Sequence, residues 1–235
     1  MRQIPLAIGP VVVPTFDNYL PGPNLAAQSH LAGLVGPSGL PVEPAAPVYL
    51  WGSAGTGKTH LLRALTERCQ AAGQSVAWFD AADRQPWLWA ADWSLVVIDR
   101  CERLDAAGQQ AAFALFVEAA AQGTQMACAG RVPPVDLPLR DDLRSRMAWG
   151  HVLALRPLTD AETRAVLRRE ADRRGVLLPD EVLNYVLSRF ERDLGYLMRM
   201  LDALDEFALV RARHITVPLV RAMLAEQGLD ERATQ

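Results

Sequence analysis

A chain of 235 residues is long enough for an α/β core and a second small domain, because single domains most often contain about 100 to 150 residues. Half of the residues are hydrophobic, 22% are charged and the formal net charge is −3. This balance is typical of a globular protein and excludes both a disordered chain and a strongly basic nucleic-acid coat, so any DNA contact is expected to be local or indirect.

The cysteines Cys69, Cys101 and Cys128 lie in apolar stretches and form no CxxC pair, which favours a reducing compartment. Prolines and glycines interrupt the apolar run at the N-terminus, so the sequence predicts neither a signal peptide nor a membrane span of about 20 apolar residues. We therefore expect a cytoplasmic protein without a membrane partner.

The first part of the chain changes from irregular sequence to alternating elements. Residues 1–23 are rich in Pro and Gly, which predicts an extended arm, and a short helix is predicted over 24–34. From residue 48 short apolar runs alternate with helical stretches, as in a doubly wound α/β domain. Five buried parallel strands are predicted at Val48–Trp51, Val76–Phe79, Leu95–Ile98, Met126–Ala129 and Val152–Leu155.

Helical periodicity replaces the strands in the last third of the chain. Thr159 and Glu162 have the spacing of a capping box, which predicts the start of a helix. A second helix is predicted after Pro179, and two more follow with apolar residues at i, i+3 and i+4. Residues 157–228 are therefore predicted to form an all-helical domain, followed by a tail at 229–235.

The segment from Gly52 to Thr59, GSAGTGKT, matches the phosphate-loop pattern GxxxxGK[ST] between a predicted strand and a predicted helix. Glycines let successive backbone N–H groups point at a phosphate, and Lys58, the only lysine of the chain, reaches the outer phosphates while the Thr59 hydroxyl binds Mg²⁺. A purely structural glycine turn is the alternative. The residues predicted to hold ADP or ATP are Gly52, Ser53, Ala54, Gly55, Thr56, Gly57, Lys58, Thr59 and His60.

A carboxylate follows the third predicted strand, at Asp99. In P-loop proteins an acid at the end of a strand beside the loop helps to hold Mg²⁺. Thr59 and Asp99 are therefore the predicted magnesium residues, with a capping role for Asp99 as the alternative.

The order of these parts resembles the AAA+ family, which combines a P-loop domain with a helical lid. The runs Leu143–Gly150, LRSRMAWG, and Val132–Pro134 narrow the resemblance to the DnaA/Hda family of replication proteins, over roughly residues 15–226. The resemblance implies an AAA+ nucleotide-binding domain at 15–156, with a doubly wound parallel five-stranded sheet, and a C-terminal all-helical lid domain at 157–228.

Several positions depart from what the resemblance implies for ATP hydrolysis. The family often places a second acid after the Mg²⁺-holding Asp, where this chain has Arg100, and a positive charge does not accept a proton. The sensor position after the fourth strand falls near Gly130 and Arg131, and the lid arginine of the family falls on Gly195. Glu102 is a candidate displaced base, although we expect it to be surface-exposed. These departures predict a chain that holds nucleotide with at most weak ATPase activity of its own.

Arg146 matches the arginine finger that AAA+ proteins present to a neighbouring subunit's nucleotide. Arg144, two residues away, points about 200° around a helix from it. The alternative for Arg146 is a surface salt bridge with Asp141 or Asp142. A finger without a complete hydrolytic set indicates a protein that activates another ATPase.

The N-terminal segment QIPLAI resembles the short peptides with which replication proteins dock on the DNA polymerase sliding clamp. Such an extended segment buries apolar side chains in a groove while an amide fixes the register. A disordered tail is the alternative. The predicted clamp-binding residues, in an arm over 1–14, are Gln3, Ile4, Pro5, Leu6 and Ile8.

The leading hypothesis from the sequence is a nucleotide-bound regulator rather than an enzyme. It would couple the clamp to DnaA and stimulate hydrolysis of DnaA-bound ATP through Arg146, restraining replication initiation. A homo-oligomer is possible. The alternatives are an autonomous AAA+ ATPase, such as a helicase loader, and a DnaA-like nucleotide-binding adaptor without finger function.

Overall fold

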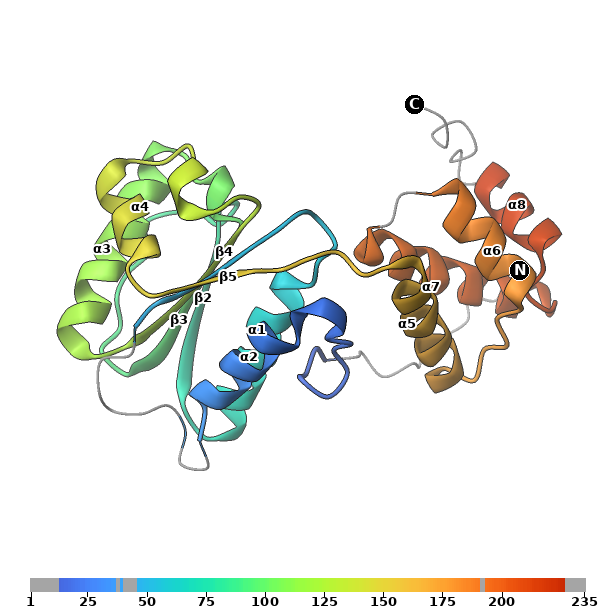
Figure 1. Ribbon diagram of the computed structural model, residues 1–235, viewed down its shortest axis with the longest axis horizontal. Coiled ribbons are helices and arrows are strands. Elements are labelled where there is room, and N and C mark those ends of the chain that lie inside the picture. Colours follow the sequence, from blue (N-terminus) through green and yellow to red (C-terminus); the bar gives the residue numbers. More distant parts are fainter. Residues whose placement is uncertain (1–12, 37–38, 40–45, 191–192, 227–235) are drawn as a thin grey trace, which may run out of the picture. The chain divides into compact units, whose positions relative to one another are not determined.

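The computed structural model describes residues 13–36, 39, 46–190 and 193–226. These residues form two compact units that meet in sequence at Pro157 and Leu158: an α/β unit and a helical unit (Figure 1). The predicted clamp-binding residues Gln3–Ile8 and the tail at 229–235 lie outside the described residues.

The α/β unit is built on a five-stranded sheet with the order β2-β3-β4-β1-β5. Every neighbouring pair of strands is parallel. This confirms the predicted doubly wound sheet, and each strand end lies within two residues of its predicted position. The strands are β1 Val48–Trp51, β2 Ser75–Asp80, β3 Trp93–Asp99, β4 Gln125–Gly130 and β5 His151–Ala154.

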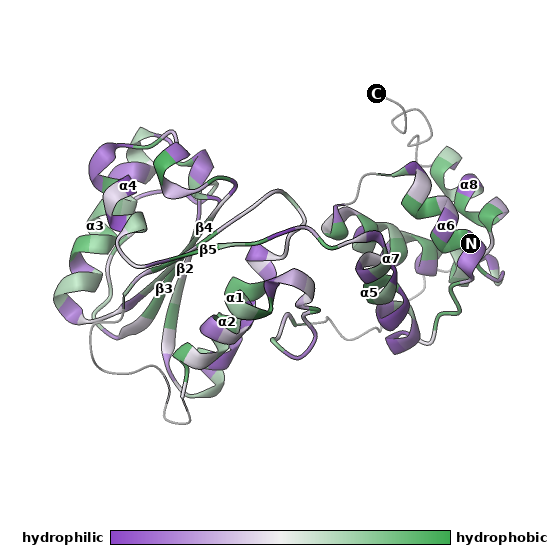
Figure 2. Ribbon diagram, in the orientation of Figure 1, coloured by the Kyte–Doolittle hydropathy of each residue, from purple (hydrophilic) through white to green (hydrophobic). Residues whose placement is uncertain are grey.

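Helices cover both faces of this sheet, because successive residues of a buried strand point to opposite sides. Leu50 packs in a cluster with the helices that flank the phosphate loop, whereas its neighbour Tyr49 packs in a cluster with the later helices. Both clusters are apolar, as the hydrophobic colouring of the strands in Figure 2 indicates. The first face carries α1 Leu25–Leu34 and α2 Lys58–Ala71, and the second carries α3 Ala106–Gln122 and α4 Asp141–Ala148.

The segment before α1 departs from the prediction. The extended arm predicted over 1–23 is wrong for its described part, because residues 16–18 form a turn and Gly22–Asn24 form the 3₁₀-helix η1. Thr15 and Asn18 close the turn with reciprocal hydrogen bonds of 2.8 and 3.3 Å between backbone amides and side-chain oxygens. Tyr19 is buried against the phosphate loop, which holds the segment on the domain.

The helical unit contains four helices over its described residues, as the sequence predicts. The capping box is confirmed: the Glu162 amide donates to the Thr159 hydroxyl at 3.3 Å, and the Glu162 carboxylate accepts from the Thr159 amide at 2.7 Å. A third apolar cluster fills the space between the helices. None of the described helices is long and apolar enough to cross a membrane. The helices are α5 Asp160–Arg173, α6 Asp180–Arg189, α7 Leu194–Arg211 and α8 Val217–Glu226.

Candidate functional site

The phosphate loop connects β1 to α2, and its glycines are required by its geometry. Gly52, Gly55 and Gly57 have φ angles of 153°, 75° and 92°, which side chains rarely tolerate. A Cβ on Gly52 would lie 2.3 Å from the carbonyl oxygen of Leu155, and one on Gly57 would lie 2.6 Å from the Tyr19 ring. Gly57 immediately precedes α2, so the loop places backbone amides at a helix N-terminus, the arrangement that binds phosphate.

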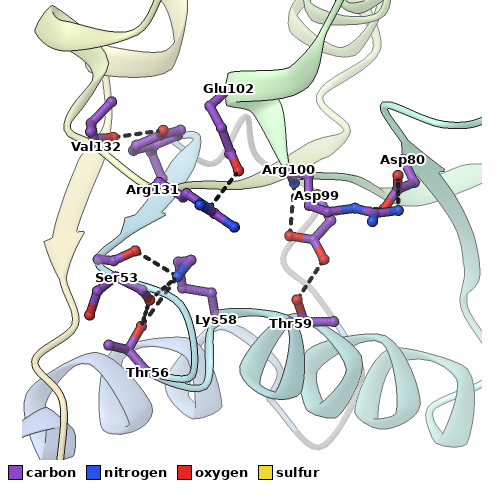
Figure 3. A network of polar contacts seen from close by, with 12 residues as sticks. Ser53, Thr56, Lys58, Thr59, Asp80, Asp99, Arg100, Glu102, Arg131 and Val132 are labelled. Carbon is purple, nitrogen blue, oxygen red and sulfur yellow. Dashed lines mark hydrogen bonds and ion pairs between the residues drawn. The ribbon is translucent and has the colours of Figure 1, made fainter. Parts of the chain in front are cut away.

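Lys58 places its ammonium at the mouth of this loop (Figure 3). Its Nζ donates to the carbonyl oxygens of Gly52 and Ser53, each at 2.7 Å, and lies 3.3 Å from the hydroxyl oxygen of Thr56. Thr56 is itself fixed by a hydrogen bond of 2.9 Å to the Ser53 carbonyl. The Lys58 ammonium is therefore held among loop atoms, where it would contact an anion bound by the loop.

Thr59 and Asp99 are brought together as predicted for a magnesium site. The Thr59 hydroxyl, at the start of α2, donates to the Asp99 carboxylate at the end of β3 over 2.6 Å. The Arg100 amide donates to the other Asp99 oxygen at 2.9 Å. Burial raises the pKa of Asp99, and these two hydrogen bonds oppose the rise. A hydroxyl paired with a strand-end carboxylate is a donor set that fits Mg²⁺ carried by a nucleotide.

The Arg100 side chain points away from Asp99, towards the neighbouring strand β2. Its backbone adopts a left-handed conformation with φ of 55°, and its guanidinium engages both carboxylate oxygens of Asp80 at the end of β2, with Nε 2.6 Å from one of them. The interaction with Asp80 raises the pKa of Arg100 further. The position after Asp99 therefore holds a paired cation and no proton acceptor.

Glu102 differs from the sequence prediction, because it is not surface-exposed. It lies in the 3₁₀-helix η2, Cys101–Arg103, and only 16% of its side chain is exposed. One carboxylate oxygen forms an ion pair of 3.4 Å with Nε of Arg131, and the other is buried without a hydrogen-bond partner among the described residues. The short helical turn after β3 directs the side chain towards the end of β4, where Gly130 presents no side chain of its own.

The second candidate region is helix α4, which carries Arg146. The Arg146 guanidinium lies over the ring of Phe113 in α3, with Cζ 4.9 Å from the ring centre. The two carboxylates considered as its partners pair with other arginines: Asp141 with Arg144, and Asp142 with Arg140. The alternative of a salt bridge between Arg146 and either acid is therefore wrong.

Comparison with known families decides where the chain belongs. Residues 160–224 match the family model described as the Hda lid domain, and residues 13–82 match the model of the bacterial DnaA ATPase domain. Together the two matches span more than half of the sequence and fall one in each structural unit. The chain is a DnaA/Hda-family AAA+ protein.

Solved structures share the fold of this DnaA/Hda-family protein. Domain III of the Thermotoga maritima replication initiation protein DnaA superposes with a TM-score of 0.75 at 21% identity, covering 90% of this chain and 95% of that one. AMPPCP-bound DnaA from Aquifex aeolicus has a TM-score of 0.69 at 18% identity, covering 96% of this chain and 71% of that one. The Thermotoga maritima RuvB Holliday junction branch migration motor has a TM-score of 0.66 at 18% identity, covering 90% of this chain and 72% of that one. The predicted AAA+ fold is confirmed.

The lid of this DnaA/Hda-family protein has a glycine where the resemblance implies an arginine. Gly195 is the second residue of α7, close after Asp193, whose carboxylate caps the helix by accepting from the Tyr196 amide at 2.7 Å. A Cβ on Gly195 would lie 3.1 Å from that carboxylate and 3.6 Å from a guanidinium nitrogen of Arg199. Arg199, one turn further along α7, therefore brings a guanidinium close to this position.

Sequence reasoning missed the contacts between the N-terminal segment and the phosphate loop. Tyr19 donates to the Thr56 carbonyl at 3.4 Å, and His60, predicted as a nucleotide-loop residue, donates from Nε2 to the Thr15 carbonyl at 2.9 Å. The His60 ring centre lies 5.4 Å from that of Tyr19. Burial lowers the pKa of His60, and the bond to Thr15 offsets part of that change. The aromatic residues within the Pro-rich segment were the available signal, because exposed arms rarely need them.

Proposed function

We propose that this protein holds ATP or ADP with Mg²⁺ on the loop from Gly52 to Thr59 and regulates DnaA through Arg146. In this role it docks on the sliding clamp, presents Arg146 to ATP bound by DnaA, accelerates hydrolysis of that ATP and restrains replication initiation. The observation that carries the proposal is the environment of Arg146, which faces an aromatic ring while both nearby acids bind other arginines.

Nucleotide binding is supported by the loop and by the relatives of the chain. Lys58 would contact the outer phosphates, and the Thr59 hydroxyl and Asp99 carboxylate would hold the cation that neutralises them. The similar DnaA structure from Aquifex aeolicus is AMPPCP-bound. We therefore assign ADP or ATP, with Mg²⁺, as the ligand of this loop.

Weak hydrolysis by the chain itself follows from the groups beside Asp99. Efficient ATP hydrolysis needs a residue that orients the attacking water and accepts its proton. Arg100 bound to Asp80 offers neither function, and Glu102 is occupied by Arg131. ATP bound on this loop would therefore be hydrolysed slowly.

Arg146 would act on the phosphates of a partner. A guanidinium that reaches a transferring phosphoryl group stabilises the negative charge on its oxygens, and such fingers contribute about 10³ to 10⁵ in rate. A finger paired with a carboxylate would first have to break that pair. The Phe113 ring does not neutralise the charge of Arg146. The Arg146 guanidinium is therefore suited to bind a phosphate.

Clamp docking rests on the sequence of the segment Gln3–Ile8, which precedes the described residues. Its alternating apolar side chains suit a groove on the clamp. A clamp loaded on DNA would concentrate the protein where DnaA acts, so the proposed contact with DNA is indirect.

The decisive experiment is a single-turnover assay of labelled ATP bound to DnaA, with the clamp loaded on DNA and this protein added. We expect the wild type to accelerate hydrolysis and Arg146→Ala to remove the acceleration, a loss of about 10³. Gln3→Ala should reduce only the clamp-dependent part.

Arg144→Ala is the matched control, because Arg144 lies on the same helix but pairs with Asp141. This variant should retain most of the stimulation. Equal stimulation by wild type and Arg146→Ala would refute the finger and leave an adaptor role. Rapid ATP turnover by the chain alone would instead indicate an autonomous ATPase.

A further inference from the structure

Helix α1 is joined to strand β5, at one edge of the sheet, in two places. Just before α1, the Asn24 side chain donates to the Arg156 carbonyl at 2.9 Å and accepts from the Arg156 amide at 2.7 Å. Further along α1, the His30 ring contacts the ring of His151, the first residue of β5. The helix and the strand therefore run in opposite directions, and two imidazole rings are in contact where they meet.

The two imidazole rings lie close enough to share a small cation. Their centres are 4.3 Å apart and their planes are inclined by 55°. A transition-metal cation binds imidazole nitrogens at about 2.0 to 2.1 Å, so one cation spans two nitrogens that are about 3 to 4 Å apart. Rings at this separation and tilt can each direct one nitrogen at a common point.

One ligand atom of this pair is unused by the described part of the protein. The Nε2 atom of His30 is shielded from solvent and has no hydrogen-bond partner among the described residues. Such an atom costs free energy unless an ion or an ordered water binds it. Burial lowers the pKa of His30, and the charge of protonated His151 lowers it further. A neutral imidazole keeps the lone pair that a metal ion needs.

The backbone holds both histidines in place, and His151 provides access from solvent. Because His151 is exposed, a cation reaches the pair without opening the core. Its amide donates to the Pro47 carbonyl at 2.8 Å, and a Cβ on the preceding Gly150 would lie 1.9 Å from that carbonyl oxygen. His30 is followed in α1 by Leu31, which is fully buried. The fold therefore fixes both ligand positions before a cation binds.

We propose that His30 and His151 bind a divalent transition-metal cation of the Zn²⁺ class, which fastens α1 to β5. Imidazole is a ligand for Zn²⁺, Ni²⁺ and Cu²⁺, whereas Mg²⁺ prefers oxygen ligands. The described residues contain no group of three or more His, Cys, Asp or Glu side chains that could hold a metal, so water would complete the coordination. The site uses no residue of the phosphate loop, and it is independent of the proposed action on DnaA.

The test is calorimetry with Zn²⁺ on the full chain near neutral pH, with Mg²⁺ present to occupy oxygen sites. We expect one Zn²⁺ to bind, and His30→Asn and His151→Asn each to weaken its affinity at least about tenfold. The double variant should lose little more than either single variant, because one imidazole alone does not chelate the cation. Thermal unfolding should show that Zn²⁺ raises the midpoint of the wild type and not of these variants.

His214→Asn is the matched control, since His214 is an exposed histidine of the helical unit. It should leave the Zn²⁺ affinity unchanged. If His30→Asn does not fold, the exposed position of His151→Asn keeps the test available. No binding of Zn²⁺ by the wild type, or equal affinity in the wild type and His151→Asn, would overturn the proposal. ADP binding should be the same in all variants, so failure of the metal site would leave the assignment of the phosphate loop intact.

Discussion

The edge of the sheet beside the phosphate loop and the surface of helix α4 use arginine in opposite ways. Beside the loop, Arg100 binds Asp80 and Arg131 binds Glu102, so each cation is compensated by an acid from another element. On α4 the acids compensate the neighbours of Arg146, which itself lies over an aromatic ring. The same residue type is therefore restrained in one region and suited to meet a partner in the other.

This difference has an electrostatic basis. A carboxylate cancels most of the field of a guanidinium within a few ångströms, whereas an aromatic face orients the guanidinium and leaves its charge in place. The first arrangement suits a site that holds nucleotide without hydrolysing it rapidly. The second suits a residue that must act on a phosphate outside its own chain.

The largest effect expected on nucleotide binding tests the comparison at the phosphate loop. Lys58→Ala should weaken ADP binding at least about 100-fold, because the variant removes the charged donor closest to the loop. Calorimetry with ADP measures this loss. The charge-matched control is Arg63→Ala on the same helix, since Arg63 lies over the Trp78 ring, with Cζ 5.2 Å from its centre. Unchanged ADP affinity in Lys58→Ala would refute the assignment of the loop.

A smaller effect tests why β4 ends at Gly130, a residue without a side chain. Gly130→Ala should destabilise the α/β unit by about 1 to 3 kcal/mol, because the new methyl group overlaps the Tyr49 hydroxyl. In a Tyr49→Phe background the hydroxyl is absent, so the cost of the same substitution should fall. Urea unfolding of the four proteins in this cycle gives the coupling free energy.

Gly33→Ala provides the control for this cycle. Gly33 lies in α1, and a Cβ added there would meet nothing within 4 Å, so the alanine should stabilise the helix by about 0.5 to 1 kcal/mol. Strictly additive effects of Gly130→Ala and Tyr49→Phe would show that the hydroxyl does not exclude a side chain from the end of β4.

The sequence predicted the features that depend on local pattern. Strand periodicity located all five strands, and the glycine pattern with Lys58 located the loop that the structure places next to Asp99. Both depend on residues that are close in the chain or on general sheet topology. The family resemblance added the lid and the expected position of the finger.

The missed contacts join side chains that are far apart in the sequence. Glu102 was expected at the surface because it follows a strand end, yet its burial depends on Arg131 and on the absence of a side chain at Gly130. Tyr19 was placed in an extended arm, although its ring packs on Gly57. A single sequence carries no periodic signal for such pairs, so their discovery required coordinates.

The smallest expected effect tests the comparison at α4, where the Phe113 ring contacts both Arg146 and Arg140, but only Arg140 also pairs with an acid, Asp142. Phe113→Leu keeps an apolar side chain in α3 but removes the ring that orients the guanidinium. Stimulation of DnaA-bound ATP hydrolysis should fall about twofold to fivefold, as expected for a cation–π contact near the surface, and ADP binding should not change. Val117→Ala, at an exposed position one turn along the same helix, should leave the stimulation unaltered. If Phe113→Leu has no effect while Arg146→Ala removes the stimulation, the finger acts without positioning by the ring, and the contrast between the two regions reduces to the pairing of their acids.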